Sequence, residues 1–143
     1  MVEELGVKVL IADGNAAIRR ALFSKLLDLD VFSDTAATGR EALEKLREQA
    51  YVVVLLDLAL PGIEPEQIVS AVGALDVAQR PVVIAFASTE AARKLDVELV
   101  HIVMRKPIDI LQVAEIVTSC VKTIGVKRSS KDAVKPAGDD DSE

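Results

Sequence analysis

Short apolar runs alternate with amphipathic segments along the chain. The apolar runs occupy residues 8–12, 31–35, 52–56, 82–86 and 100–104. Three of them are apolar at every position after the first, as strands are when both faces of a sheet are covered. The run at 31–35 is more polar, which is typical of an edge strand. The pattern therefore predicts five β-strands, with 31–35 at an edge of the sheet.

Amphipathic helices are predicted after the strands, and each begins with a residue type that stabilises a first turn. The predicted starts are Asn15 for the first helix, Thr38 with Glu41 as a capping box for the second, Pro65 for the third, Ser88 or Thr89 for a short fourth helix through Leu95, and Asp109 for the fifth. Strand followed by helix, repeated with right-handed crossovers, predicts an α/β fold with a doubly wound five-stranded parallel sheet.

The length of 143 residues and the apolar content of 50% fit one domain, which we expect to cover residues 1–124. From Gly125 the apolar periodicity stops, and basic residues give way to the acidic segment 139–143. Because nothing in this segment provides a core, residues 125–143 are expected to form a disordered charged tail. We expect no DNA-binding output domain, so any output passes through another protein or through self-association.

Composition excludes several classes of partner. The net charge of −6, without a segregated basic face, argues against nucleic acid. The longest apolar run is far shorter than the roughly 20 residues that span a bilayer. The acidic start does not resemble a secretory signal, and a single cysteine, Cys120, suits a reducing cytoplasm. We interpret Cys120 as a helical packing residue, since the only histidine, His101, lies in a strand pattern.

Charged side chains come directly after three of the predicted strands. Asp13 and Asp57 follow the first and third, and Lys106 follows the fifth. The carboxyl ends of parallel strands share one edge of the sheet, so a Mg²⁺ ion between the two carboxylates would offset their repulsion. Asp57 would then be an anionic nucleophile able to take a phosphoryl group. An equally weighted alternative is a Lys106–Asp57 ion pair that only holds the two strands together.

Residues 7–123 resemble the receiver domain of two-component response regulators, which has a flavodoxin-like (βα)5 fold. The matching stretches are KVLIADGNAAIR (8–19), GREAL (39–43), VLLDLALPG (54–62), PVVI (81–84) and RKP (105–107). The resemblance implies that Asp57 accepts a phosphoryl group from a phosphohistidine on a partner histidine kinase or phosphotransfer protein. It also implies that Asp13 and the Ala59 backbone carbonyl bind Mg²⁺ with Asp57, and that Lys106 contacts the phosphoryl oxygens.

Three positions depart from the family pattern. Gly14 stands where the family has a second acid, so the Mg²⁺ site is expected to be weakened. Phe86 stands where the family has Thr or Ser, and Val103 where it has an aromatic residue that reports phosphorylation. Phe86 is expected to fill space between the fourth and fifth strands, which would explain both changes. Ser88 would replace the lost hydroxyl only if its loop folds back.

These residues leave two hypotheses open. The first is a single-domain response regulator, phosphorylated on Asp57, that signals through protein contacts made by the fourth helix, fifth strand and fifth helix or through a homodimer. The alternative is a pseudo-receiver that binds a partner without phosphorylation. A turnover enzyme is not expected, because Asn15 replaces the acid of aspartate phosphatases and no dinucleotide-binding glycine motif follows the first strand.

Overall fold

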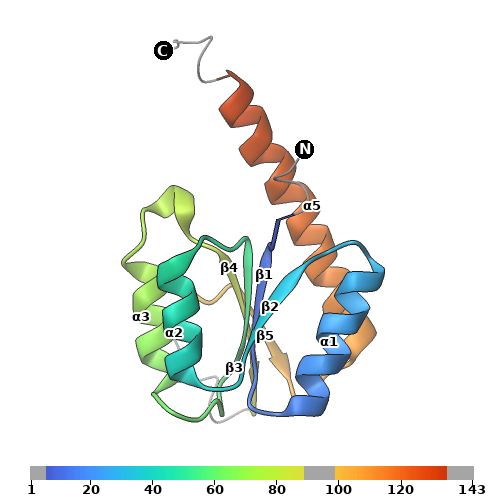
Figure 1. The fold of residues 1–143 in the computed structure, drawn as a ribbon, viewed down its shortest axis with the longest axis vertical. Helices are drawn as coiled ribbons and strands as arrows, with labels where there is room; N and C mark the ends of the chain where they lie inside the picture. The colour runs from blue at the N-terminus through green and yellow to red at the C-terminus, as the bar shows by residue number, and fades with distance from the viewer. Residues whose placement is uncertain (1–5, 89–98, 135–143) are drawn as a thin grey trace.

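The computed structural model describes residues 6–88 and 99–134. Five parallel strands form one sheet in the order β2-β1-β3-β4-β5 (Figure 1). The strands are β1 (Val9–Ala12), β2 (Ser33–Ala36), β3 (Val53–Asp57), β4 (Val82–Ala87) and β5 (Ile102–Arg105). The predicted parallel sheet and its polar edge strand, β2, are confirmed. Strand ends differ from the predicted ones by one or two residues.

Helices cover both faces of the sheet. Helices α1 (Ala16–Asp28) and α5 (Ile110–Val134) pack together on one face, and α2 (Gly39–Glu48) and α3 (Pro65–Gly73) pack together on the other (Figure 1). A short 3-10 helix, η2 (Val77–Gln79), precedes β4. The arrangement is the doubly wound α/β fold that the sequence predicts. The predicted fourth helix, from Ser88 or Thr89 through Leu95, lies almost wholly outside the described residues.

Two hydrophobic cores lie on the two faces of the sheet, because successive strand residues point to opposite faces. In β1, Val9 and Ile11 join the core beneath α1 and α5, whereas Leu10 and Ala12 join the core beneath α2 and α3. β3 and β4 alternate in the same way, so their residues are buried on both sides. The central strands are thereby fixed in register, and their carboxyl ends lie together at one edge.

Helix starts largely follow the predicted caps. The Asn15 side chain accepts hydrogen bonds from the backbone N–H groups of Ala17 and Ile18, and Asp109 caps α5 by accepting from Gln112. Thr38 accepts from the Glu41 N–H, but the Glu41 carboxylate binds the N–H of Ala37 instead of that of the cap residue. Pro65 is the first residue of α3, as predicted.

Helix α5 continues past the predicted end of the domain. Its backbone is helical through Val134 and projects beyond the sheet (Figure 1). The predicted domain end at residue 124 thus falls within this helix, which includes residues 125–134. The sequence of residues 125–134 has no apolar stripe, but a helix continues without one because its backbone hydrogen bonds are local. Residues 135–143 lie outside the described part of the chain.

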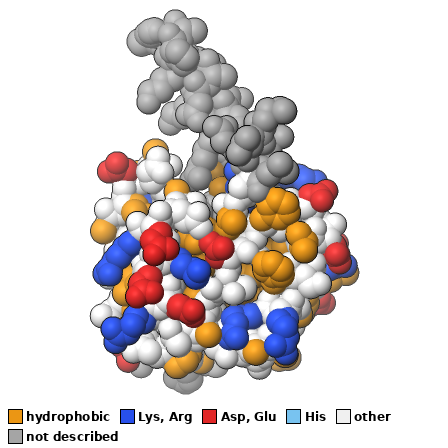
Figure 2. All heavy atoms as spheres, viewed as in Figure 1, with side chains coloured by type: hydrophobic (Ala, Val, Ile, Leu, Met, Phe, Trp, Pro, Cys, Tyr) orange, Lys and Arg blue, Asp and Glu red, His pale blue; other side chains and the backbone are white. Residues whose placement is uncertain are grey.

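The surface differs between the two helical layers. Figure 2 shows acidic and basic side chains interspersed over the α2 side, whereas hydrophobic side chains gather over α1 next to basic ones. Phe23 and Leu27, one turn apart on α1, are 40% and 46% exposed. Among residues 6–88 and 99–134 we find no helix with the length and apolar character needed to cross a bilayer.

Candidate functional site

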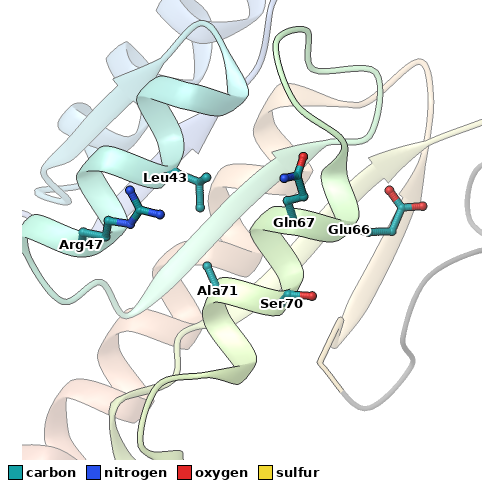
Figure 3. A pocket seen from close by; sticks show the side chains of 6 residues that line it. All are labelled: Leu43, Arg47, Glu66, Gln67, Ser70 and Ala71. Atoms are coloured by element: carbon teal, nitrogen blue, oxygen red, sulfur yellow. The ribbon is translucent and has the colours of Figure 1, made fainter.

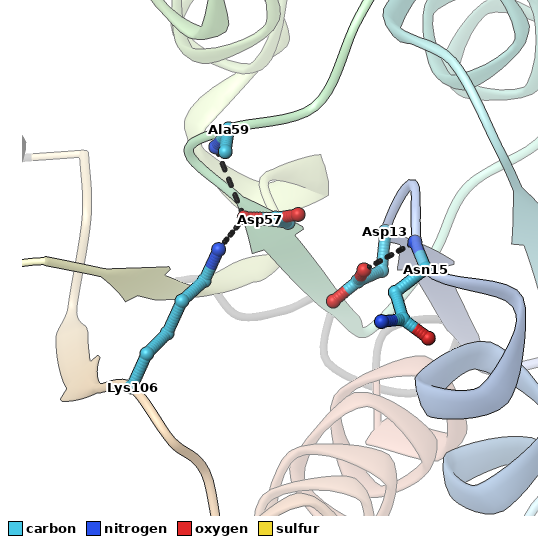
Figure 4. Close-up of polar contacts among 5 residues, drawn as sticks. All are labelled: Asp13, Asn15, Asp57, Ala59 and Lys106. Atoms are coloured by element: carbon cyan, nitrogen blue, oxygen red, sulfur yellow. Dashed lines mark hydrogen bonds and ion pairs between the residues drawn. The ribbon is translucent and has the colours of Figure 1, made fainter.

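Asp13, Asp57 and Lys106 meet at the carboxyl edge of the sheet (Figure 4). β1 and β3 are neighbours, and Asp13 follows β1 while Asp57 is the last residue of β3. Both acids are buried, at 4% and 5% exposure. Buried carboxylates require a partner or an ion to offset the lost hydration, so this edge is a chemically unusual part of the molecule.

One oxygen of Asp57 carries two hydrogen bonds. The Lys106 Nζ lies 2.5 Å from Oδ1, and the backbone N–H of Ala59 donates to the same oxygen over 3.0 Å. The Lys106 backbone N–H binds the carbonyl of Ala87, which fixes the start of its side chain beside β4. The Lys106 side chain is 41% exposed, so it approaches Asp57 from the solvent side.

Asp13 is held through its side chain and its backbone. Its Oδ1 accepts the N–H of Asn15 over 2.8 Å, and its carbonyl accepts a hydrogen bond from the Arg19 guanidinium over 2.9 Å. Burial raises the pKa of Asp13 above its usual 3.8, and the charge of nearby Asp57 raises it further, while Asn15 and Lys106 oppose the rise. The two carboxylates therefore lie close enough to interact, with their other oxygens facing each other in Figure 4.

The donor set at this edge suits a hard cation. Two facing carboxylates provide oxygen ligands, and Mg²⁺ fills its remaining positions with water when a protein offers few ligands. Within the described ranges, no cluster of three or more acidic, histidine or cysteine side chains forms a metal site. Gly14, next to Asp13, provides no carboxylate, and a Cβ built there would lie 3.0 Å from Cδ of Pro61.

The loop after Asp57 packs directly against the start of α2. The N–H of Gly39 donates to the carbonyl of Pro61 over 2.7 Å, and a Cβ on Gly39 would collide with the Ile63 side chain. Gly62 has φ 106°, a left-handed conformation that glycine adopts without strain. These glycines let the loop that carries Ala59 lie close to the first turn of α2.

Phe86 and Val103 lie on opposite faces of the sheet. Phe86 pairs with Met104 in the β4–β5 register, and Val103 pairs with Ala85. Phe86 is fully buried in the core beneath α1 and α5, whereas Val103 is 47% exposed. The prediction that one packing change explains both substitutions is wrong, because the two side chains point to different sides. Ser88 follows the end of β4 and is exposed.

The single cysteine and histidine take part in packing and backbone contacts. Cys120 lies partly buried on α5, and burial raises the pKa of its thiol, so the unreactive thiol form prevails at neutral pH. The Nδ1 of His101 accepts the N–H of Val83, which joins the chain ahead of β5 to β4. Neither residue borders Asp57 in these contacts.

A groove of about 470 Å³ lies between α2 and α3 (Figure 3). It is lined by Leu43, Arg47, Glu66, Gln67, Ser70 and Ala71. None of the residues predicted for the site contributes to this groove. The candidate chemistry therefore remains at the carboxyl edge of the sheet.

Sequence reasoning identified the charged residues but missed their supports. The structure brings together Asp13, Asp57 and Lys106 as expected, and it adds a hydrogen bond from the Ala59 N–H to Asp57. The Ala59 carbonyl as a Mg²⁺ ligand remains a prediction. The contacts of the Asn15 N–H and of Arg19 with Asp13 were not predicted. Arg19 lies six residues after Asp13 in the first turns of α1, and this spacing was the available signal.

Comparisons with known proteins agree on the fold. A response regulator receiver domain protein from Methanospirillum hungatei superposes with a TM-score of 0.71 at 24% identity, over 82% of this chain and 95% of that one. The response regulator TrrA of Thermotoga maritima, solved in complex with Mg²⁺ and BeF, has a TM-score of 0.68 at 23% identity, over 80% and 99%. The predicted receiver fold is confirmed.

Two further comparisons are more distant or more partial. The receiver domain of Saccharomyces cerevisiae Ssk1, solved with the histidine phosphotransfer protein Ypd1, has a TM-score of 0.66 at 18% identity, over 81% of this chain and 90% of that one. The probable transcriptional regulator ycf27 of Guillardia theta is 39% identical over 57 residues, which are 40% of this chain and 22% of that protein. No protein-family model matches the chain.

Proposed function

We propose that this chain is a response regulator receiver that accepts a phosphoryl group on Asp57 from a phosphohistidine of a partner kinase or phosphotransfer protein. The observation that carries the proposal is the position of Lys106, 2.5 Å from Asp57, at the edge where Asp13 also lies. The solved complex of a similar receiver fold with a phosphotransfer protein supports the choice of partner.

The chemistry follows from the two oxygens of Asp57. An anionic carboxylate oxygen attacks phosphorus, the P–N bond of the phosphohistidine breaks, and the imidazole leaves with the electron pair. Lys106 and the N–H of Ala59 bind Oδ1, whereas the other oxygen faces Asp13, so the two oxygens of Asp57 have different neighbours. Lys106 is also placed to neutralise charge on the transferred oxygens.

Asp13, Asp57 and the carbonyl of Ala59 would hold Mg²⁺ in this role. The bound cation supplies charge neutralisation for the phosphoryl oxygens. The Mg²⁺ and BeF complex of a similar receiver fold supports this assignment. Because Gly14 provides no carboxylate, we expect weaker Mg²⁺ binding than a site with three acids would give.

Acetyl phosphate with Mg²⁺ tests the proposal directly. We expect the intact mass to rise by about 80 Da, the mass of one added phosphoryl group. Asp57→Asn should abolish the gain, whereas Asp28→Asn, which changes an exposed acid on α1, should retain it. No mass gain in the unmodified chain, with acetyl phosphate or with a purified kinase, would contradict the proposal.

Output through protein contacts completes the proposed function. Val103 on β5 and Leu111 on α5 are 47% and 50% exposed, so apolar surface is available on the face predicted to bind a downstream protein or a second copy. In this role the chain is a cytoplasmic signalling module and not a turnover enzyme on a small molecule. The fourth helix predicted for this face lies almost wholly outside the described residues.

A pseudo-receiver is the second candidate, and Phe86 favours it. The fully buried ring has no hydroxyl, so residue 86 on β4 offers no hydrogen bond to a phosphoryl group on Asp57. In this alternative the Lys106–Asp57 ion pair only holds β5 against β3. A partner that binds the unmodified chain and Asp57→Asn with equal affinity, without any phosphorylation of the former, would favour this function.

A further inference from the structure

We propose that Arg19 is a positioning residue for Asp13, which it holds through the backbone. The inference rests on the proposed function, because it concerns the same Mg²⁺ site. The Arg19 Nη1 donates to the carbonyl oxygen of Asp13 over 2.9 Å, and the contact is partly buried. Arg19 itself is anchored in α1, since its backbone N–H donates to the carbonyl of Asn15 over 3.0 Å. The side chain thus reaches back past the start of the helix.

Two other contacts show how little else holds this segment. The Asp13 N–H donates to Ala36 across the β1–β2 pair, and the Asp13 Oδ1 accepts from the N–H of Asn15. Among the contacts of the described residues, only the one from Arg19 binds the carbonyl oxygen of the Asp13–Gly14 peptide. Rotation about the Asp13 Cα–C bond would move the following Asn15 N–H, which binds the Asp13 carboxylate.

Gly14 makes this restraint more important. Glycine loses more conformational freedom on folding than any other residue, and Gly14 is exposed on the surface of the β1–α1 loop. A residue with a Cβ would limit the rotation of the Asp13–Gly14 peptide by itself. In this chain the hydrogen bond from the Arg19 guanidinium to the Asp13 carbonyl restrains that rotation instead.

The sign of the effect separates positioning from simple electrostatics. Removing a cation near two carboxylates should strengthen binding of Mg²⁺, because less positive charge repels the ion. Losing a group that orients a metal ligand should weaken binding, and loss of such supporting contacts typically lowers metal affinity about 10- to 100-fold. The two explanations therefore predict opposite changes in the same measurement.

Arg20 is the matched control. It follows Arg19 on α1, lines the same groove of about 530 Å³ beside β2, and is exposed to solvent. The structure records no hydrogen bond from Arg20 within the described ranges, whereas Arg19 binds Asp13. Replacing either arginine by methionine removes one positive charge and keeps most of the stem, and only Arg19→Met removes the contact with Asp13.

Calorimetric titration with Mg²⁺ alone tests the inference. We expect Arg19→Met to bind Mg²⁺ about tenfold more weakly than the unmodified chain. Arg20→Met should bind equally or slightly more tightly, and Arg19→Lys, which keeps the charge but lacks the planar fork, should fall between the two. Thermal melts of all variants without Mg²⁺ show whether any of them is merely less folded.

A second measurement reports on the loop without metal. Amide hydrogen exchange at Asn15, whose N–H binds the Asp13 carboxylate, should become faster in Arg19→Met and stay unchanged in Arg20→Met. Equal Mg²⁺ affinities and equal exchange rates in the two methionine variants would overturn the role of Arg19 and leave the proposed function standing. An unmodified chain that neither binds Mg²⁺ nor gains mass would instead overturn the proposed function.

Discussion

The carboxyl edge of the sheet has two halves of different character. The β1–β3 half carries two buried acids, and a lysine from the end of β5 closes over one of them. In the β4–β5 half, Phe86 is fully buried in the core and Val103 is about half exposed. The first half keeps groups suited to phosphoryl transfer, and the second lacks the hydroxyl and aromatic ring through which receiver domains usually report it.

This difference separates two requirements of a receiver. Chemistry depends on charges at fixed positions, which the ends of β1, β3 and β5 supply. Communication depends on a side chain that changes position with occupancy, and a ring packed in the core is a poor candidate because close-packed interiors resist rearrangement. A chain can therefore retain acceptor chemistry after losing this route of output.

The largest expected effect tests whether Phe86 serves packing. Phe86→Ala should lower the free energy of unfolding by about 3–5 kcal/mol, because it removes a fully buried ring and leaves a cavity. Val103→Ala, at a half-exposed position, should change it by about 0.5 kcal/mol or less. Urea denaturation followed by circular dichroism measures both.

A milder variant covers the case in which Phe86→Ala does not fold. Phe86→Leu keeps an apolar side chain and should cost about 1–2 kcal/mol. If Phe86→Leu and Val103→Ala were equally harmless, the contrast between a buried and an exposed position in the β4–β5 half would be wrong.

An intermediate effect is expected from adding an acid to the β1–β3 half. Gly14→Asp should tighten Mg²⁺ binding by about tenfold, because it adds a carboxylate near Asp13 and Asp57. The new Cβ would lie 3.0 Å from Pro61, so the gain should be larger when Pro61→Ala makes room. Calorimetric titration of the single and double variants measures the difference.

The Pro61→Ala variant alone is the control for that experiment. An unchanged Mg²⁺ affinity in both Gly14 variants would show that the half with the acids is not built around a metal ion. Equal Mg²⁺ affinities in the single and double variants would show instead that the Pro61 ring does not hinder an acid at position 14.

The smallest effect concerns the ionisation of Asp13. Since burial raises its pKa in the folded chain, the folded state binds the proton more tightly than the unfolded state does. Ionised Asp13 therefore lowers stability at neutral pH, and this penalty disappears as the pH falls through the raised pKa towards 3.8. Without Mg²⁺, Asp13→Asn should raise the Tm at pH 7 and have less effect near pH 4.

Asp28→Asn provides the comparison, because Asp28 is exposed on α1. We expect its Tm to follow that of the unmodified chain at both pH values. A Tm of Asp13→Asn that is lower than that of the unmodified chain at pH 7 would contradict the sign derived for the buried acid.

The spacing of apolar residues predicted most of the fold, because buried side chains recur with different periods in strands and in helices. The apolar runs at 52–56 and 82–86 and the cap at Asn15 were recognisable from the sequence alone. The end of α5 could not be recognised in this way, because a helix needs only local hydrogen bonds to continue and its last turns have no apolar stripe in the sequence.

The site was predictable where the topology determines it. Asp13, Asp57 and Lys106 follow strands whose carboxyl ends share one edge, so their meeting follows from the strand order. The face to which Phe86 points depends on register, which a one-residue shift reverses. The contact of Arg19 with a backbone carbonyl leaves no trace in composition or hydropathy, and the spacing of six residues from Asp13 does not by itself predict it.

The close packing of Gly39 against the loop after Asp57 limits how that loop can move. Because the Pro61 carbonyl is bound to the Gly39 N–H and no atom separates Gly39 from Ile63, the loop cannot shift without breaking that bond or displacing the first turn of α2. Movement of this loop, which follows Asp57, would therefore displace the start of α2, at a place separate from Phe86 and Val103.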